Sequence, residues 1–384
     1  MKDAAEPIEL ERNEVDNRFE TIAAWILPFH PAAAFVALIG LSLRVRRVWA
    51  GLREQKADLT IWALLGLAGV ISVVGAYDSG RAAIEWFAPF LFLWLYALGR
   101  WAVQAPSRFL RAMLRGTAAL ALVIVLARLF KLEFAVGDFT VLGAFARPGQ
   151  RGNVLGIQSN GLAVILEAGV VGGFGLLLLA RTVRERMEAA VMAVLCLAAV
   201  AITLSRGAMV GMTVGAAVLG LLLTPRSLLA FVLAGMGTLA VSPRVRTRFL
   251  SILDLGAHEA RIGIWQSTLR MIRDHFWFGV GPGNFGRVYP SYAVTESVAK
   301  FGSAHNNYLY FTAAWGVIGG VLFFGWQAWV MIRSLLRGLT PYQKIMWAIL
   351  VAFGTHVLFD DLMAAYVGLL LGCLENPAYR SSEA

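Results

Sequence analysis

The chain has 384 residues, of which 58% are hydrophobic and 15% charged, and its formal net charge is +10. Apolar runs of helix-spanning length fill the spaces between short charged clusters, which argues against a soluble domain and predicts an all-α, polytopic integral membrane protein. The runs are too continuous for the alternating strands of a membrane barrel.

About twelve transmembrane helices are predicted, or eleven if the polar first segment lies on the membrane surface. Residues 1–18 form an acidic tail without the basic start of a signal peptide. Two prolines in Leu27–Pro31 then turn the first two segments into a hairpin. The expected segments are 18–28, 31–48, 58–76, 82–99, 110–130, 159–180, 187–204, 207–223, 226–242, 306–333, 342–358 and 363–376.

Short basic segments separate many of these spans, and the positive-inside rule places them in the cytoplasm together with both termini. This bias explains the positive net charge, so no nucleic acid partner is expected. Two long segments, 131–158 and 243–305, then face the other side as loops of a single transmembrane domain, 19–384. Cys196 and Cys373 lie in apolar runs and predict no disulfide framework.

Arg206 lies between two apolar runs within Ile202–Met212. Burying an arginine in a membrane costs roughly 2.5–3.5 kcal/mol on insertion scales, and pairing with an anion makes it tolerable. Arg206 is therefore either a snorkelling arginine at a turn or part of an anion site.

The second long segment contains a predicted basic amphipathic helix, Glu259–Phe278, which carries Arg261, Arg270 and Arg273. Such a helix lies on a membrane surface, where its arginines meet lipid headgroups or a substrate. The residues at spacings of three and four that form its apolar stripe are Ile262, Trp265, Leu269, Ile272 and Phe276.

The stretch GVGPGNFG, Gly279–Gly286, follows this helix. Its four glycines and Pro282 forbid a continuing helix and allow close backbone approach to a ligand, although a plain tight turn has the same composition. A nucleotide-binding loop is rejected because no strand precedes the glycines.

His305 stands where the long polar segment re-enters the membrane, with Tyr308 on the same helical face. It is either a hydrogen-bonded structural group or a catalyst. The sequence has no HExxH pair and no Cys/His cluster at ligand spacing, so we expect neither a metal site nor a cofactor. Asp360 and Asp361 form an acidic pair at another outer turn, where they pair with arginines, act on a substrate or satisfy the turn.

Several arginines, one histidine and a glycine-rich loop thus converge on one membrane face. A neutral histidine can take a proton from a hydroxyl, and arginines bind phosphate oxygens and offset the charge of a leaving group. This combination predicts transfer from a lipid-linked diphosphate to a hydroxyl acceptor.

The sequence resembles the O-antigen ligase/polymerase superfamily over roughly residues 140–375. The order of its short motifs carries the resemblance. They are Gln158–Ala163, Ser205–Ala208, Arg261 with Trp265, Gly279–Phe285, Ala304–Leu309 and Trp315–Gly320.

The resemblance implies a metal-independent, inverting glycosyltransferase of the bacterial inner membrane, with a periplasmic site and an undecaprenyl-diphosphate-linked glycan as donor. Arg206 and Arg261 match the family arginines that engage the diphosphate, and His305 matches the histidine that activates the acceptor. A family glutamate is absent from Ala313–Trp315 here. Possible further substrate contacts are Arg147, Arg151, Asn160, Arg270, Asn306, Asn307 and Tyr308.

The expected acceptor is the lipid A–core of lipopolysaccharide, as in O-antigen ligation. One alternative is a polymerase that joins lipid-linked repeat units of O-antigen or exopolysaccharide. Another class of protein, a transporter or flippase of lipid-linked glycans, should show inverted repeats and broken helices at the midplane, which the sequence does not indicate.

Overall fold

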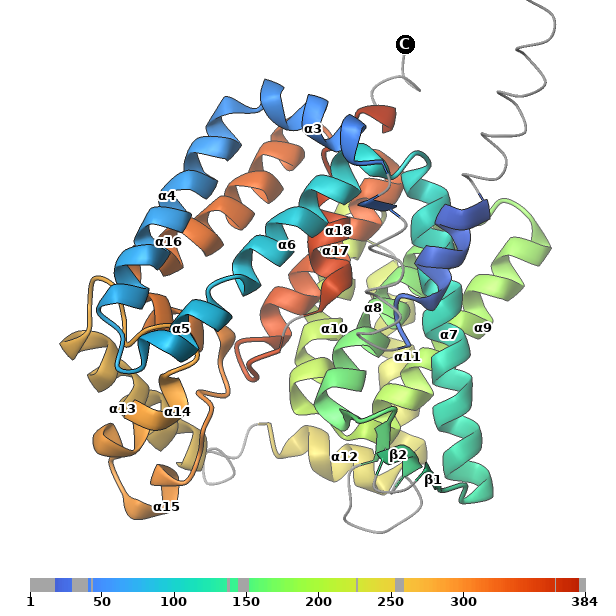
Figure 1. Ribbon diagram of the computed structural model, residues 1–384. Helices are drawn as coiled ribbons and strands as arrows, with labels where there is room; N and C mark the ends of the chain where they lie inside the picture. Colours follow the sequence, from blue (N-terminus) through green and yellow to red (C-terminus); the bar gives the residue numbers. More distant parts are fainter. Residues whose placement is uncertain are drawn as a thin grey trace, which may run out of the picture.

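A computed structural model of the protein describes residues 18–29, 41–42, 44–136, 139–143, 152–225, 227–252, 259–362 and 364–379. Most of the described residues are helical, which confirms the all-α expectation (Figure 1). Residues 18–26 form a helix before the numbered elements. The longer helices are α3 Val45–Glu54, α4 Lys56–Val74, α5 Ser79–Glu85, α6 Ala88–Ala97, α7 Pro106–Phe130, α8 Ser159–Leu179, α9 Val183–Thr203, α10 Arg206–Leu222, α11 Ser227–Val241, α12 Pro243–Leu250, α13 Glu259–Asp274, α16 Asn307–Leu336, α17 Pro341–His356 and α18 Ala365–Cys373.

Six helical stretches are long and apolar enough to cross a membrane: 56–74, 79–102, 106–130, 159–179, 183–203 and 307–336. α10 and residues 231–241 of α11 are shorter apolar helices. Of the other expected spans, α17 has 16 residues and α18 has 9, and residues 30–40 of the predicted hairpin lie outside the described residues. The structure thus supports a polytopic membrane protein, while the count of twelve stays a prediction.

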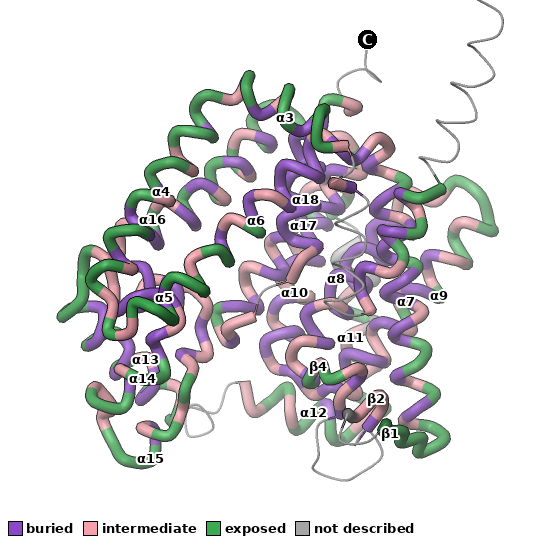
Figure 2. The backbone as a smooth tube through the Cα atoms, viewed as in Figure 1, coloured by how far each residue is buried: buried purple, intermediate pink, exposed green. Residues whose placement is uncertain are grey.

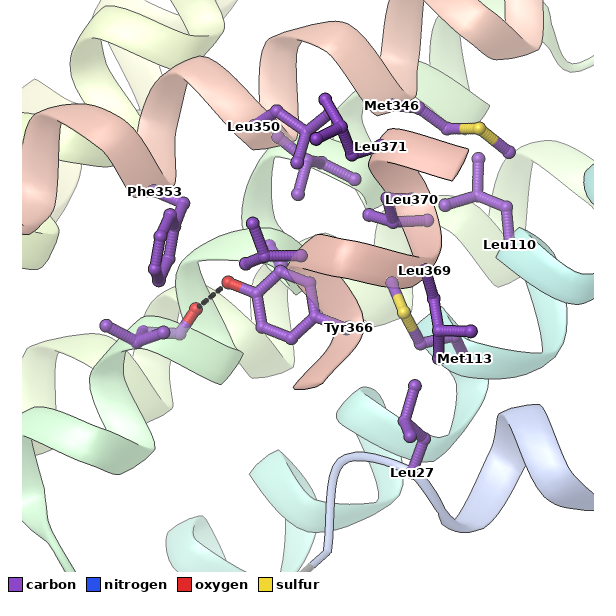
Figure 3. Packing of buried hydrophobic residues seen from close by; sticks show 14 of the residues in the cluster. Leu27, Leu110, Met113, Met346, Leu350, Phe353, Tyr366, Leu369, Leu370 and Leu371 are labelled. Carbon is purple, nitrogen blue, oxygen red and sulfur yellow. Dashed lines mark hydrogen bonds between the residues drawn. The ribbon is translucent and has the colours of Figure 1, made fainter. Parts of the chain in front are cut away.

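The buried core gathers where α8, α10, α17 and α18 pack together (Figure 2). Tyr366 of α18 donates its hydroxyl to the backbone oxygen of Val164 on α8 at 2.9 Å, amid leucine and methionine side chains from α7, α17 and α18 (Figure 3). On α4, by contrast, Leu64, Leu67 and Val74 are exposed, which suits a lipid-facing helix.

A small antiparallel sheet lies in the first of the two long segments, where the sequence predicts a loop. Its strands are β1 Phe134–Val136, β2 Phe139–Gly143, β3 Asn153–Val154 and β4 Ile157–Gln158, paired in that order. β4 leads directly into α8, so the sheet fixes the start of that helix. The sheet lies at the end of the bundle opposite α3 (Figure 1).

Residues 259–305, here called the lobe, have a small core of their own, which also takes in Ala313. The lobe contains α13, α14 Phe285–Val288, the 3₁₀ turn η3 Tyr289–Tyr292 and α15 Glu296–Ala299. It packs through α13 against α16. The lobe is therefore a folded part of the molecule. It is a loop only in the sense that it lies between two predicted membrane spans.

Helix α16 is broken at Gly316, where a single continuous span was expected. Gly316 has φ 72° and ψ 175°, and a Cβ there would lie 2.1 Å from the Trp277 oxygen. The break frees the carbonyls of Ala313 and Ala314, which accept the backbone N–H groups of Val280 and Gly281 at 3.0 and 3.1 Å. The N–H of Val317 donates to the Phe276 oxygen at 2.8 Å. The glycine-rich stretch of the lobe thus completes the hydrogen bonding of the broken helix.

A cluster of buried charges lies at the α3 end of the bundle. Glu375 accepts from Arg100 at 2.5 Å and from Arg337 at 3.0 Å, and it also contacts Arg333. Asp58 lies 3.3 Å from Arg100. Arg100 belongs to the π-helical turn η1, Leu98–Ala102, which continues α6. The cluster joins the ends of α4, α6, α16 and α18, and the sequence analysis did not find it.

Candidate functional site

His305 occupies the turn that leads from the lobe into α16. Its φ of 46° is in the left-handed region, and its N–H donates to Ser303 Oγ at 3.1 Å. Asn306 then caps α16, because its side-chain oxygen accepts the N–H of Leu309 at 3.0 Å. The N–H of Asn307 donates to the carbonyls of Val357 and Asp360 at 2.9 and 3.1 Å. These two hydrogen bonds hold the start of α16 against the segment that follows α17.

Asp360 contacts the His305 ring. The distance from His305 Nδ1 to Asp360 Oδ1 is 3.4 Å, with the histidine side chain 32% exposed and the aspartate 9%. Asn160, in the first turn of α8, donates its amide to Asp360 Oδ2. A carboxylate that holds Nδ1 leaves Nε2 as the nitrogen that can face a substrate.

Asp361 lies beside this pair. Burial raises the pKa of its carboxyl above the usual range, while a hydrogen bond from Ser303 and the nearby His305 act in the opposite direction. Ligand atoms of His305, Asp360 and Asp361 all lie within 4.8 Å of one another, close enough to hold a metal ion. The sequence does not reveal this cluster, because the three residues lie in two distant segments. Metal-independent chemistry stays a prediction.

Arg206 is the first residue of α10 and is half-buried. Its Nη1 donates to the Ser251 oxygen at 3.4 Å, and Arg248 Nε donates to the Leu204 oxygen at 3.0 Å. The residue before it, Ser205, caps the helix and lies 3.5 Å from His356 Nε2. The start of α10 therefore contacts the end of α17.

Arg261 is half-buried in the first turn of α13, four residues before Trp265. The Trp265 ring lies 6.5 Å from the ring of Phe359, centroid to centroid. Arg270 lies exposed further along the helix. Of the predicted apolar stripe, Ile262, Leu269 and Phe276 are exposed, so this face is open to a membrane surface. The face that packs into the lobe carries Gly263, Ile264, Ser267, Thr268, Met271 and Ile272.

One short segment, residues 356–361, joins all of these parts. His356 contacts the residue before Arg206, Phe359 contacts the helix turn that follows Arg261, and Asp360 contacts His305 and Asn160. We call these residues the junction segment. It brings together the surroundings of Arg206, Arg261 and His305, although these three residues lie about 50 to 100 residues apart in the sequence.

Two apolar cavities lie beside the site. One, of about 560 Å³, is lined by residues of α16, α17 and α18, among them Asn307, Tyr308 and Phe324. The other, of about 490 Å³, is lined by residues of α8, α9, α10, α11 and α12, among them Met209 of α10 and Phe249 of α12. The first reaches the residues next to His305, and the second reaches the first turns of α10.

The remaining predicted contacts have different outcomes. Asn160 and Asn307 lie at the junction segment, but Asn306 is buried as a helix cap. Tyr308 donates its hydroxyl to the Gly354 oxygen at 3.1 Å, within the wall of the first cavity. Arg147 and Arg151 lie outside the described residues. The glycine-rich stretch, expected to approach a ligand or form a turn, uses the N–H groups of Val280 and Gly281 to bind α16.

The sequence leaves open whether Asp360 and Asp361 pair with arginines, act on a substrate or satisfy a turn, and the structure places Asp360 beside His305. The absent glutamate at Ala313–Trp315 is a usable signal: if that glutamate orients the acceptor or the histidine in other members of the family, another group must do so here, and Asp360 is the carboxylate that contacts His305. His356 and Glu167 were missed, since nothing in the sequence pairs them.

Comparison with protein families finds a match over part of the chain. The family model described as O-antigen ligase matches residues 191–324, a segment that includes Arg206, Arg261 and His305 and ends before the junction segment. This confirms the resemblance seen in the sequence. A search of curated proteins finds no match.

Proposed function

We propose, from the match of residues 191–324 to the O-antigen ligase family model, that the protein transfers a glycan from a polyprenyl diphosphate to an acceptor hydroxyl. The observation that carries the proposal is the contact between His305 Nδ1 and Asp360, at the place where the lobe enters the bundle. Ligation of O-antigen to the lipid A–core of lipopolysaccharide is the favoured reaction, with undecaprenyl diphosphate as the carrier.

In the proposed reaction, His305 acts as the general base. Nε2 accepts the proton of the acceptor hydroxyl while the hydroxyl oxygen bonds to the anomeric carbon of the donor sugar. The bond from that carbon to the diphosphate oxygen breaks, and its electron pair leaves with the diphosphate. Attack from the face opposite the leaving group inverts the anomeric configuration. Asp360 holds Nδ1–H and stabilises the imidazolium that forms.

Arg206 and Arg261 are proposed to bind the diphosphate. Both are half-buried, and guanidinium groups bind phosphate oxygens through paired hydrogen bonds. Their positive charge offsets the charge that develops on the leaving group. No metal is needed for these steps.

The two apolar cavities support substrates that carry lipid chains. The cavity beside α10 and α12 suits the polyprenyl chain of a donor held at Arg206. The cavity beside Tyr308 suits an acyl chain of an acceptor that approaches His305.

The site is proposed to face the periplasm from the inner membrane. The sheet and the lobe lie at the end of the bundle opposite α3, whose sequence is basic (Figure 1). Single cysteines introduced at Gln55 and Glu296 should therefore react with impermeant reagents from opposite sides. Labelling from the same side would contradict this orientation.

The acceptor decides between ligase and polymerase. Purified protein should be given a lipid-linked glycan together with lipid A–core, or with a second lipid-linked repeat. Transfer to lipid A–core alone identifies a ligase, and elongation of the lipid-linked repeat identifies a polymerase. If neither product forms but the donor crosses the bilayer of proteoliposomes, the protein is a transporter and the proposed chemistry is wrong.

A further inference from the structure

A second histidine–carboxylate pair lies inside the helix bundle, between α8 and the end of α17. His356 Nδ1 is 2.8 Å from Glu167 Oε2, and His356 Nε2 is 3.5 Å from Ser205 Oγ. Glu167 and His356 are 0% exposed and Ser205 is 2% exposed. We call these three residues the buried chain.

The buried chain ends at the start of α10. Ser205 Oγ also accepts the N–H of Ala208 at 3.4 Å, so the hydroxyl that contacts His356 is the cap of the helix that Arg206 begins. A carboxylate can only accept, so Nδ1 of His356 carries a proton toward Glu167 and Nε2 faces Ser205. The helix cap is thereby fastened to both α17 and α8.

Two glycines of α10 make room for this pair. A Cβ at Gly207 would lie 2.3 Å from His356 Cδ2, and a Cβ at Gly211 would lie 2.8 Å from Glu167 Oε2. Close approach of α10 to the buried chain therefore depends on the small residues that follow Arg206. This explains the glycine of the Ser205–Ala208 motif by packing, without contact to a substrate.

A serine, a histidine and a carboxylate that contact one another in this order suggest that the serine is a nucleophile. The burial of the three side chains argues against that role. With side chains 0–2% exposed, the three residues leave no approach for a glycan, and the serine oxygen is already occupied as a cap. Their effect must reach the reaction through the placement of other groups.

We propose that the buried chain is a positioning device for Arg206, which holds the guanidinium at a fixed place relative to His305. Glu167 lies seven residues, or two helical turns, after Asn160 on α8, and His356 lies four residues before Asp360. The Glu167–His356 contact joins α8 to the end of α17, and the His305–Asp360 contact joins the start of α16 to the segment after α17, where Asn160 of α8 also bonds to Asp360. A displacement of the α10 start against His305 would have to break the Glu167–His356–Ser205 contacts. The inference rests on the proposed diphosphate role of Arg206.

A buried chain of hydrogen bonds is suited to this task because it is directional and costly to break. A polar group left without its partner inside the bundle is strongly unfavourable, so alternative placements of the helix start are suppressed. A purely apolar contact would tolerate small sliding movements, and a misplacement of about 1 Å at a reacting group can cost about a hundredfold in rate.

The test measures binding of undecaprenyl diphosphate to purified full-length protein in detergent. Glu167→Gln should weaken binding by about tenfold to a hundredfold. In an Arg206→Lys background, Glu167→Gln should weaken binding little further, because the group being positioned has already been altered. Ser205→Ala should weaken binding in the same way, and Ser205→Thr, which keeps the hydroxyl, should restore it.

Tyr366→Phe is the matched control. It removes a buried hydroxyl bonded to the Val164 oxygen on the same helix, α8, so it should lower the melting temperature without changing the dissociation constant. Unchanged binding in folded Glu167→Gln, or full additivity with Arg206→Lys, would overturn the positioning role. If Glu167→Gln fails to fold, equal binding by Ser205→Ala and the parent overturns it. Absence of binding by the parent protein itself would count against the proposed function instead.

Discussion

The carbonyl oxygen of Ala313 accepts the backbone N–H of Val280 at 3.0 Å, across the break in helix α16. Ala313 belongs to the membrane helix and Val280 to the glycine-rich stretch of the lobe. The bond therefore joins two sequence motifs about 33 residues apart, and each satisfies polar groups of the other. His305 lies between them in the chain, so its position depends on this joint.

Gly316→Ala should destabilise the protein by more than about 1–3 kcal/mol, because a side chain at φ 72° is strained and its Cβ would meet the Trp277 oxygen. Gly325→Ala is the control in the same helix, where a Cβ meets nothing within 4 Å. It should be neutral or stabilising by about 0.5–1 kcal/mol. Thermal unfolding in detergent compares the two, and equal melting temperatures would contradict the account of the break.

His305→Asn should reduce glycan transfer by about 10²–10⁴-fold, the usual contribution of a general base. Asparagine tolerates the left-handed backbone of this position, so it is a cleaner test than alanine. Binding of undecaprenyl diphosphate should be retained. Transfer at the parental rate would make His305 a structural or orienting residue.

Arg206→Lys and Arg261→Lys should each lose most transfer activity while the protein still folds, because lysine keeps the charge but lacks the planar fork. Arg273→Lys is the matched control, since Arg273 is exposed and pairs with Asp274 at 3.2 Å. The measurement is the initial rate at fixed donor concentration. Near-parental rates in both variants would assign these arginines to lipid contact alone.

Asp361→Asn should stabilise the protein at neutral pH more than at pH 4. Burial raises the folded-state pKa of Asp361 above its unfolded value, so ionisation opposes folding. The penalty is absent below the unfolded pKa, grows as the pH rises through the folded pKa, and is fully present above it. Melting temperatures at the two pH values test this. If Asp361→Asn stabilised the protein more at pH 4 than at neutral pH, the folded state would favour the ionised carboxylate.

Removal of divalent cations should leave transfer unchanged, because the proposed base is a neutral His305 held by Asp360. Activity is compared before and after EDTA dialysis. The close approach of His305, Asp360 and Asp361 makes this a sharp test. Loss of activity that is restored by Mg²⁺ would assign the cluster to a metal ion and exclude His305 as a free base.

The sequence predicted those elements that depend on local pattern. The span expected at 159–180 is helix α8, Ser159–Leu179, and the one at 110–130 lies within α7, because long apolar runs define helices without reference to the rest of the fold. The break at Gly316 could not be predicted in this way. A glycine within an apolar run is common in membrane helices, and only contact with the lobe reveals that this one interrupts the helix.

The candidate site was predicted residue by residue but not as an arrangement. The sequence singles out Arg206, Arg261 and His305, and it leaves three roles open for Asp360 and Asp361. It does not reveal that the junction segment links the neighbourhoods of the three principal residues. Its contacts with Ser205, Trp265 and His305 join parts of the chain distant in sequence, and no periodicity reports such contacts. For the same reason the sequence did not reveal the pairing of Glu167 with His356.

The joint between the lobe and α16 is made from main-chain atoms. The N–H groups of Val280, Gly281 and Val317 donate to the oxygens of Ala313, Ala314 and Phe276, respectively. Exchanging a side chain leaves such bonds in place, provided that the glycines remain. Adding or deleting a single residue between Phe276 and Gly281 would move the hydrogen-bond donors and acceptors out of register. This stretch should therefore tolerate substitutions but not insertions or deletions.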